Sequence, residues 1–226
     1  MATLTAEDMI DAGWAVLTRQ WAWLLGGGVI VAAVQGVQQL ARPQVSGGGA
    51  VAALILAARA IQFLGHGLIA RQVMEVEGLV QPGAPPRYIA YVLTSLVFMV
   101  GVALASLLLI VPGMLLLQRW FLSTNLVLAR GMNVFEALAA SGEATRGHRG
   151  PILGAWVVMW VVVGAPYGLL AWSVGLAALG HVSPLSAIGL LRLTWEVVST
   201  AISLALSIGV YSVLGTRTNT LTDVFS

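Results

Sequence analysis

The sequence predicts an all-α, polytopic membrane protein with six transmembrane helices and two short amphipathic helices at the cytoplasmic face of the membrane. Hydrophobic residues make up 58% of the 226 residues and charged residues only 9%, whereas a soluble domain carries about 25% charged residues. Apolar runs of about 20 residues, the length that crosses a bilayer, recur along the chain. Arginines outside these runs gather on one side of the predicted membrane, which gives the helices an orientation.

The chain begins with an amphipathic helix, expected over residues 6–18. Thr5 and Asp8 have the spacing of a helix N-cap and the acidic residue that complements it three positions later. Short helices of this kind lie in the headgroup plane of a membrane. The first two transmembrane helices are expected over residues 21–40 and 51–71. Because the residues before them are acidic and no cleavage site follows, we expect the first one to act as an uncleaved signal anchor.

The next apolar run, Tyr91–Ala129, is too long for one crossing, because a helix rises about 1.5 Å per residue. Pro112 and Gly113 interrupt this run, and a Pro-Gly pair is typical of a turn. The run therefore predicts a hairpin of two transmembrane helices, over residues 88–111 and 114–129, with its turn at the Pro-Gly pair.

A second amphipathic helix is expected over residues 134–145. Asn133 and Glu136 repeat the N-cap spacing seen at the beginning of the chain. Positively charged residues flank this helix, and such residues attract anionic lipid headgroups. The side chains expected to contact anionic lipid are Arg130, Arg146 and Arg149.

Prolines mark the last two transmembrane helices. Pro166 lies inside the fifth one, expected over residues 152–179, and predicts a kink there. Ser183 and Pro184 have the order of an N-cap and a first-turn proline, so they predict the beginning of the sixth helix, expected over residues 185–215.

The arginines orient these helices, since the chain contains no lysine. Cytoplasmic loops of membrane proteins carry an excess of positive charge. Only Arg42 falls in a loop on the side opposite the N-terminus. The arginines on the side of the N-terminus are Arg19, Arg71, Arg87, Arg130, Arg146, Arg149 and Arg217. Both termini are therefore expected in the cytoplasm of a bacterium, and the protein in its inner membrane.

Four charged residues lie inside the apolar runs: Arg59, Arg119, Arg192 and Glu196. A charge at the centre of a bilayer costs about 2.5–3.5 kcal/mol on insertion scales, so it usually has a partner or a use. Other polar residues share a helix face with each charge, at spacings of three or four. Gln62 and His66 accompany Arg59, Ser123 accompanies Arg119, and Ser199, Ser203 and Ser207 accompany Arg192 and Glu196. We expect these polar faces to point inward, away from lipid.

The depths of these charges allow them to line one cavity. Counted from the outer helix ends, Arg59 lies about 12 Å deep, Arg119 about 10 Å and Glu196 about 16 Å, with Arg192 one turn shallower. Three guanidinium groups against one carboxylate favour an anion, because arginine binds phosphate or carboxylate with two parallel hydrogen bonds. The hypothesis is a non-enzymatic protein that binds, or helps to move, an anionic lipid or a small anion through this cavity.

Two alternatives explain the same residues. Arg192 and Glu196 can pair with each other at i, i+4, while Arg59 and Arg119 bond to backbone carbonyls or extend toward the headgroups. The protein would then be a scaffold or assembly partner, as a homo-oligomer or with another membrane protein. Its contact surfaces would be the glycine-rich fifth transmembrane helix and the arginine-rich amphipathic helix. In the other alternative, His66 and Glu196 belong to a proton or ion path.

The sequence carries no pattern typical of an enzyme. Its three histidines are isolated from one another, no metal-binding spacing occurs, and there is no cysteine. We therefore expect no catalytic residue, no metal site and no cofactor. A net charge of +2 with scattered arginines argues against nucleic-acid binding, which leaves membrane lipids as the expected partners.

The segment Pro112–Gly150 resembles a known group of bacterial integral membrane proteins. The residues that carry the resemblance are Pro112-Gly113, Arg119-Trp120, Ala137-Leu138, Ser141 and Thr145-Arg146-Gly147. They are similar to the pattern of the YciC-like proteins, whose function is uncharacterised, and of the membrane domain attached to some glycerophosphodiester phosphodiesterases. Gly142 and Gly150 stand where this group often has aromatic residues. The resemblance implies a six-helix membrane fold but not hydrolysis, because that activity belongs to a separate soluble domain in the fused proteins.

Overall fold

Every secondary-structure element that the computed structural model describes is a helix, over residues 4–41, 47–174 and 186–225. In chain order these are α1 (Ala6–Ala41), α2 (Gly48–Val76), α3 (Tyr88–Leu108), α4 (Ile110–Trp120), α5 (Ser123–Arg130), α6 (Val134–Ala144), α7 (Arg149–Met159), the π-helix η2 (Trp160–Gly164), α8 (Ala165–Val174) and α9 (Ala187–Phe225). Among them, α1, α2, α3 and α9 are long and apolar enough to cross a membrane. The predicted all-α class is confirmed, and four helices of this length and apolar composition are compatible with a membrane protein.

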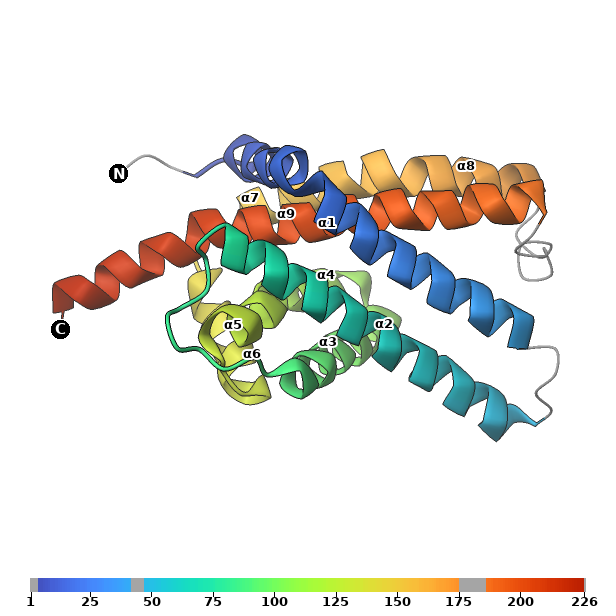
Figure 1. The fold of residues 1–226 in the computed structure, drawn as a ribbon. Helices are drawn as coiled ribbons and strands as arrows, with labels where there is room; N and C mark the ends of the chain where they lie inside the picture. Colours follow the sequence, from blue (N-terminus) through green and yellow to red (C-terminus); the bar gives the residue numbers. More distant parts are fainter. Residues whose placement is uncertain (1–3, 42–46, 175–185, 226) are drawn as a thin grey trace.

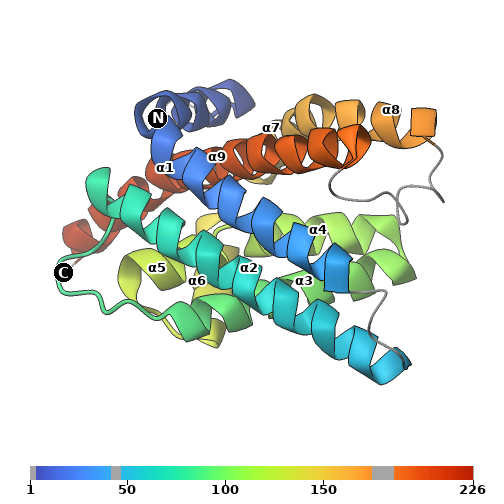
Figure 2. The same ribbon diagram turned by 45° about the vertical axis from the view of Figure 1, so that its right-hand side comes forward.

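Helices α1 and α9 pack closely along each other at the centre of the fold (Figures 1 and 2). Glycine makes this approach possible. A Cβ atom on Gly28 would lie 2.7 Å from the Cα atom of Val197, and one on Gly13 would lie 2.9 Å from the Cα atom of Leu206. Both distances are below van der Waals contact, so a side chain at either position would push α9 away. Helix α2 packs against α1 and α3, and α3 packs against α4.

A kink at Gln20 divides α1, because this residue has non-helical backbone angles (φ −117°, ψ 22°). The kink lies where the sequence predicts the change from the amphipathic helix to the first long apolar helix. Arg19 and Gln20 both donate hydrogen bonds to the Glu77 carboxylate, at 2.6 Å from Arg19 Nη2 and 3.0 Å from Gln20 Nε2. The predicted N-cap is confirmed, since Thr5 and Asp8 exchange hydrogen bonds between side chain and backbone.

The turn between α3 and α4 lies at Leu109, whose backbone is extended (φ −161°, ψ 142°), and not at the Pro-Gly pair. The predicted boundaries at residues 111 and 114 are therefore wrong. Pro112 fits the first turn of α4, where its missing N–H would have no helical partner. A Cβ atom on Gly113 would lie 2.9 Å from the Cα atom of Ser106, so this glycine serves close packing of α4 on α3.

The predicted helix over residues 114–129 is divided between α4 and α5, and α6 packs against the break. The Ser141 hydroxyl bridges it, because it accepts a hydrogen bond from the Leu122 N–H at 3.1 Å and donates one to the Arg119 carbonyl at 2.8 Å. The predicted cap of α6 is confirmed as a capping box between Asn133 and Glu136. Helix α6 therefore buries one face against its neighbours, including Ser141 and Gly142.

The predicted helix over residues 152–179 consists of α7, η2 and α8 as far as the structure describes it. The π-helix η2 ends two residues before Pro166, which lacks the N–H that a regular helix would need. The Trp195 indole of α9 donates a hydrogen bond of 3.1 Å to the Val163 carbonyl, which lies within η2. The predictions for Arg42, for residues 175–179 and for the Ser183-Pro184 cap fall outside the described residues, and α9 begins at Ala187.

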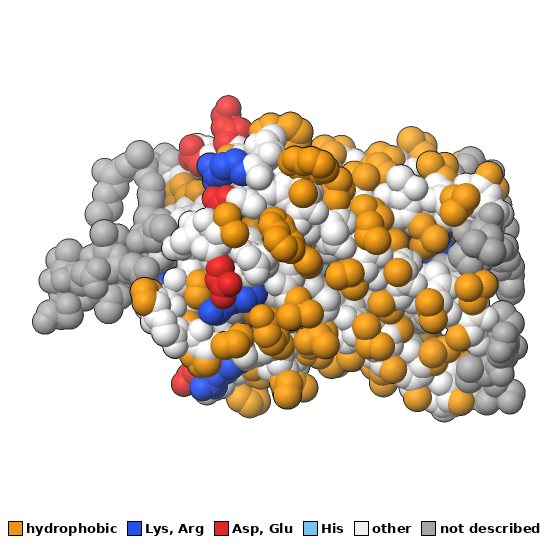
Figure 3. All heavy atoms as spheres, viewed as in Figure 1, with side chains coloured by type: hydrophobic (Ala, Val, Ile, Leu, Met, Phe, Trp, Pro, Cys, Tyr) orange, Lys and Arg blue, Asp and Glu red, His pale blue; other side chains and the backbone are white. Residues whose placement is uncertain are grey.

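Charged side chains gather at one end of the molecule, around the beginning of α1, while hydrophobic side chains are spread over the rest of the face in Figure 3. Ion pairs join Arg19 to Glu77, Arg71 to Glu75 and Arg146 to Glu143. Large apolar side chains away from this end are openly exposed, such as Leu107 (83%) and Trp172 (82%). A surface with many exposed large apolar side chains is typical of contact with lipid or with another protein.

Arg71 ties three parts of the charged end together. Its guanidinium is almost fully buried, and it donates to the Glu75 carboxylate at 2.6 Å, to the Leu128 carbonyl of α5, and to the Ala84 carbonyl at 3.0 Å in the connection between α2 and α3. The sequence predicts Arg71 only as a topology determinant, whereas the structure shows it as a structural contact.

Candidate functional site

The polar face of α2 forms one connected group, as its spacing of three and four predicts. Arg59 Nη1 donates a hydrogen bond of 2.9 Å to Gln62 Oε1, and Gln62 is only 2% exposed. The Gln62 Nε2 and His66 Nε2 atoms are both buried and have no hydrogen-bond partner among the described residues. Arg59 itself is exposed. This group, which we name the α2 polar site, combines Arg59, Gln62 and His66.

Arg119 and Ser123 do not act as one group on α4 and α5. Ser123 is fully buried, and its hydroxyl donates a hydrogen bond of 2.6 Å to the Trp120 carbonyl. Arg119 is exposed and lies over α6, because a Cβ atom on Gly142 would meet its Nε atom at 2.9 Å and its Cγ atom at 3.2 Å. The space where the family resemblance would place an aromatic residue is thus filled by the arginine side chain.

Arg192 contacts α1. With the Gln39 amide turned so that its oxygen faces α9, both terminal nitrogens of Arg192 donate to that oxygen, Nη1 at 2.9 Å. One face of α9, which we name the α9 stripe, contains Arg192, Glu196, Ser199, Ser203 and Ser207. At its other end, the hydroxyl and the carbonyl oxygen of Ser207 each accept a hydrogen bond of 2.8 Å from the Asn125 Nδ2 atom. The two ends of the α9 stripe therefore form hydrogen bonds between helices, Arg192 with α1 and Ser207 with α5.

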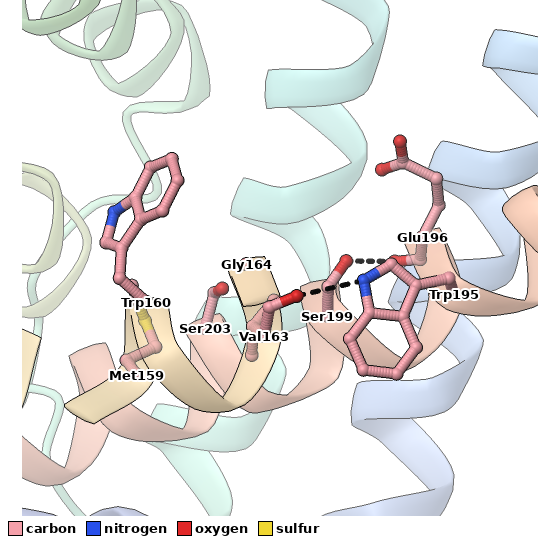
Figure 4. A pocket seen from close by; sticks show the side chains of 8 residues that line it. All are labelled: Met159, Trp160, Val163, Gly164, Trp195, Glu196, Ser199 and Ser203. Carbon is pink, nitrogen blue, oxygen red and sulfur yellow. Dashed lines mark hydrogen bonds between the residues drawn. The ribbon is translucent and has the colours of Figure 1, made fainter. Parts of the chain in front are cut away.

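The middle of the α9 stripe lines a cavity of about 270 Å³ between η2 and α9 (Figure 4). From α9, the cavity is lined by Trp195, Glu196, Ser199 and Ser203. From α7 and η2, it is lined by Met159, Trp160, Val163 and Gly164. The Glu196 carboxylate and the Trp160 ring project to the same side of the two helices, with the serine hydroxyls between them. We name this space the Glu196 cavity.

A second cavity, of about 220 Å³, lies between the first half of α1, α7 with η2, and α9. Its lining is almost entirely apolar and includes Ile10, Trp14, Val158 and Ile202, with Met159 shared with the Glu196 cavity. Its surface can accept a hydrocarbon group, but it offers no polar side chain that would select a ligand.

The structure brings the predicted site residues into separate places. Arg59, Gln62 and His66 form the α2 polar site, and Glu196 and Ser199 line the Glu196 cavity. Neither the Glu196 cavity nor the second, apolar cavity has Arg59, Arg119 or Arg192 in its lining. A binding role for those arginines stays a prediction. Sequence reasoning missed Trp160, Trp195 and Asn125, although Trp195 stands next to Glu196 in the chain.

The predicted lipid-contact arginines at the charged end differ in their partners. Arg130 Nη2 lies 3.5 Å from the Gly215 carbonyl of α9, and Arg146 pairs with Glu143 at 3.0 Å. Arg149 is exposed at the beginning of α7. These positions are compatible with contact to anionic headgroups, which stays a prediction for all three.

No protein-family model, curated protein or solved structure matches this chain. The resemblance of Pro112–Gly150 to the YciC-like group therefore stays a prediction, and the function rests on the site geometry alone.

Proposed function

We propose that this chain is an integral protein of a bacterial inner membrane that crosses the bilayer six times. The crossings are the second half of α1, α2, α3, α4 with α5, α7 to α8, and α9, with the first half of α1 and α6 at the cytoplasmic interface. The gathering of charged side chains at one end, and the apolar surface elsewhere, support this arrangement. The beginning of α1 and the end of α9 both lie toward the charged end, which supports cytoplasmic termini.

Within that membrane, the protein binds, or helps to move, an amphiphile with an anionic group, and it does so without catalysis. The observation that carries this proposal is the α2 polar site. The Gln62 amide oxygen already accepts a hydrogen bond from Arg59. The hydrogen-bonding capacity that Gln62 leaves unused is therefore the pair of N–H donors on its Nε2 atom. A buried polar atom without a partner costs about 1–3 kcal/mol. A ligand oxygen that accepts from Gln62, and from His66 in its Nε2–H tautomer, would remove this cost.

The chemistry of the α2 polar site favours an anion over a neutral acceptor. The guanidinium of Arg59 is exposed next to the amide and forms no ion pair with any described residue. Hydrogen bonds from a guanidinium to phosphate or carboxylate are about twice as strong as neutral ones. Arg59 lies about 16 Å along α2 from Gly48, so the anionic group would sit inside the membrane or draw a headgroup toward it. The exposed Arg119 offers a further contact for the same class of lipid.

The test compares lipids that differ only in headgroup charge. The full chain is purified in a mild neutral detergent, and its unfolding midpoint is measured with added phosphatidylglycerol or phosphatidylcholine of equal chain length. Phosphatidylglycerol is expected to raise the midpoint more, and Arg59→Gln and Gln62→Leu are each expected to remove the difference. Glycerol phosphate, added separately, tests whether the anionic group alone suffices.

The matched control is Arg87→Gln, which removes an exposed arginine outside the apolar helices. It should keep the full preference for phosphatidylglycerol, because Arg87 immediately precedes α3 and is not part of the α2 polar site. A parent protein without any preference, or variants at Arg59 and Gln62 that keep it, would refute the proposal.

A second candidate is a scaffold or assembly partner, and the exposure of α8 favours it. Among the described residues, no atom outside its own neighbourhood comes within 4 Å of a Cβ placed on Gly168, and the adjacent Leu169 is 72% exposed. An open glycine on an apolar helix lets another helix approach closely. Mass spectrometry of the gently purified protein separates the two functions, since a scaffold predicts a second chain and lipid binding predicts a retained lipid.

A further inference from the structure

The Glu196 cavity holds a carboxylate that nothing in the described part of the chain neutralises. The Glu196 side chain is half-buried, and it accepts no hydrogen bond and forms no ion pair with a residue in the ranges 4–41, 47–174 and 186–225. It lies about 14 Å along α9 from Ala187, within an apolar helix. An ionised carboxylate away from water needs a cation or becomes protonated.

The polar groups around this carboxylate can accept hydrogen bonds. The Ser199 hydroxyl donates its hydrogen to the Glu196 backbone carbonyl at 3.1 Å, which leaves its oxygen lone pairs free to accept. The Ser203 hydroxyl lines the same cavity and can accept as well. Trp195 adds no donor, because its indole N–H is directed to the Val163 carbonyl.

The Trp160 ring bounds the cavity at the end opposite Glu196 (Figure 4). The ring is 55% exposed and tilted by 52° against Trp156, at a centroid distance of 5.5 Å. The face of an indole attracts cations, and among aromatic side chains it does so most strongly. A carboxylate at one end and an indole at the other give the cavity two features that both favour positive charge.

We propose that the Glu196 cavity binds a primary ammonium group, either of an amine-headgroup lipid or of a free amine. The three N–H donors of such a group match the Glu196 carboxylate and the hydroxyl oxygens of Ser199 and Ser203. The volume of about 270 Å³ is at the lower limit of small-molecule pockets, so it admits the headgroup while the acyl chains stay outside. The cavity shares no residue with the α2 polar site, and this proposal does not depend on the anion proposal.

The test uses the full chain in nanodiscs of phosphatidylcholine and phosphatidylglycerol, neither of which carries a primary amine. Phosphatidylethanolamine then replaces phosphatidylcholine stepwise, and the unfolding midpoint and tryptophan fluorescence are recorded. Both are expected to change as phosphatidylethanolamine is added. A parallel series adds ethanolamine in the aqueous phase. A response to both probes identifies the amine group itself as the ligand, and a response to the lipid alone identifies the lipid.

Variants at the cavity complete the test. Glu196→Gln is expected to raise the amount of phosphatidylethanolamine needed for half the response at least tenfold, and Ser203→Ala to raise it severalfold while keeping the charge. Glu143→Gln, which removes an exposed carboxylate at the charged end, should respond like the parent. No response to either amine in the parent, an equal response to choline, or an unaltered response in both cavity variants would overturn the proposal.

Discussion

Replacing Arg71 by methionine removes the guanidinium that joins α2, α5 and the connection before α3, while it keeps the apolar stem of the side chain. Two backbone carbonyls, of Leu128 and Ala84, lose their charged donor. A buried acceptor left without a partner costs about 1–3 kcal/mol. The pair with Glu75 adds little, because that carboxylate is 46% exposed and can be hydrated. With two such acceptors, the expected loss in the free energy of unfolding is about 2–6 kcal/mol.

The assay is reversible unfolding in mixed micelles, followed by circular dichroism. Arg87→Met is the matched control, because Arg87 is exposed and the same substitution there should change the free energy by less than about 0.5 kcal/mol. Arg71→Lys should recover only part of the loss, since a lysine ammonium cannot donate in the same fork geometry. If Arg71→Met is within about 1 kcal/mol of Arg87→Met, a structural role for the guanidinium is refuted.

Four further substitutions test other parts of the fold by the same measurement. Gly28→Ala should lower the free energy of unfolding by about 1–3 kcal/mol, because its Cβ atom would lie 2.7 Å from the Val197 Cα atom. At Gly26, no described atom beyond the neighbouring residues of α1 comes within 4 Å of an added Cβ atom, so Gly26→Ala should be neutral or stabilising. Equal effects at the two glycines would contradict the packing of α1 on α9. Asn125→Ala should cost about 1–3 kcal/mol by breaking two hydrogen bonds to α9, and no loss would show that these bonds do not form. Gln62→Leu removes the unpartnered Nε2 donor together with the hydrogen bond that Oε1 accepts from the exposed Arg59, so without ligand it should change the free energy of unfolding by less than about 1 kcal/mol; a large loss would mean that Nε2 has a partner.

The features that the sequence predicts correctly depend on residues close together in the chain. The caps at Thr5 and Asn133 are confirmed because their partners lie three residues away on the same helix. The α2 polar site is of the same kind, since Arg59 and Gln62 meet across a single turn. Helix class and helix faces follow from such short spacings, which any helix of this sequence would share.

The features that the sequence does not predict depend on contacts between distant helices. The Pro-Gly pair is compatible both with a turn and with the first turn of a helix, and the packing of Gly113 on Ser106 decides for the helix. The Ser141 bridge across the break between α4 and α5 joins residues about twenty positions apart. The expected meeting of four charges in one cavity assumed helix rotations that only tertiary packing sets, and these rotations place Arg119 over Gly142 and Arg192 beside Gln39.

The close packing of α1 on α9 has a consequence for the order of assembly during synthesis. Helix α9 is the most buried of the long helices, with 56% of its apolar stretch covered against 28% for α1 and 17% for α2 and α3. It also follows all of them in the chain. At the usual rate of translation, α1 is synthesised on the order of ten seconds before α9, the helix that it contacts most. During that interval, the face of α1 that contains Gly13 and Gly28 is not yet covered by α9, so lipid or an insertion factor can contact it. The angle between α1 and α9 is fixed only after α9 has been synthesised.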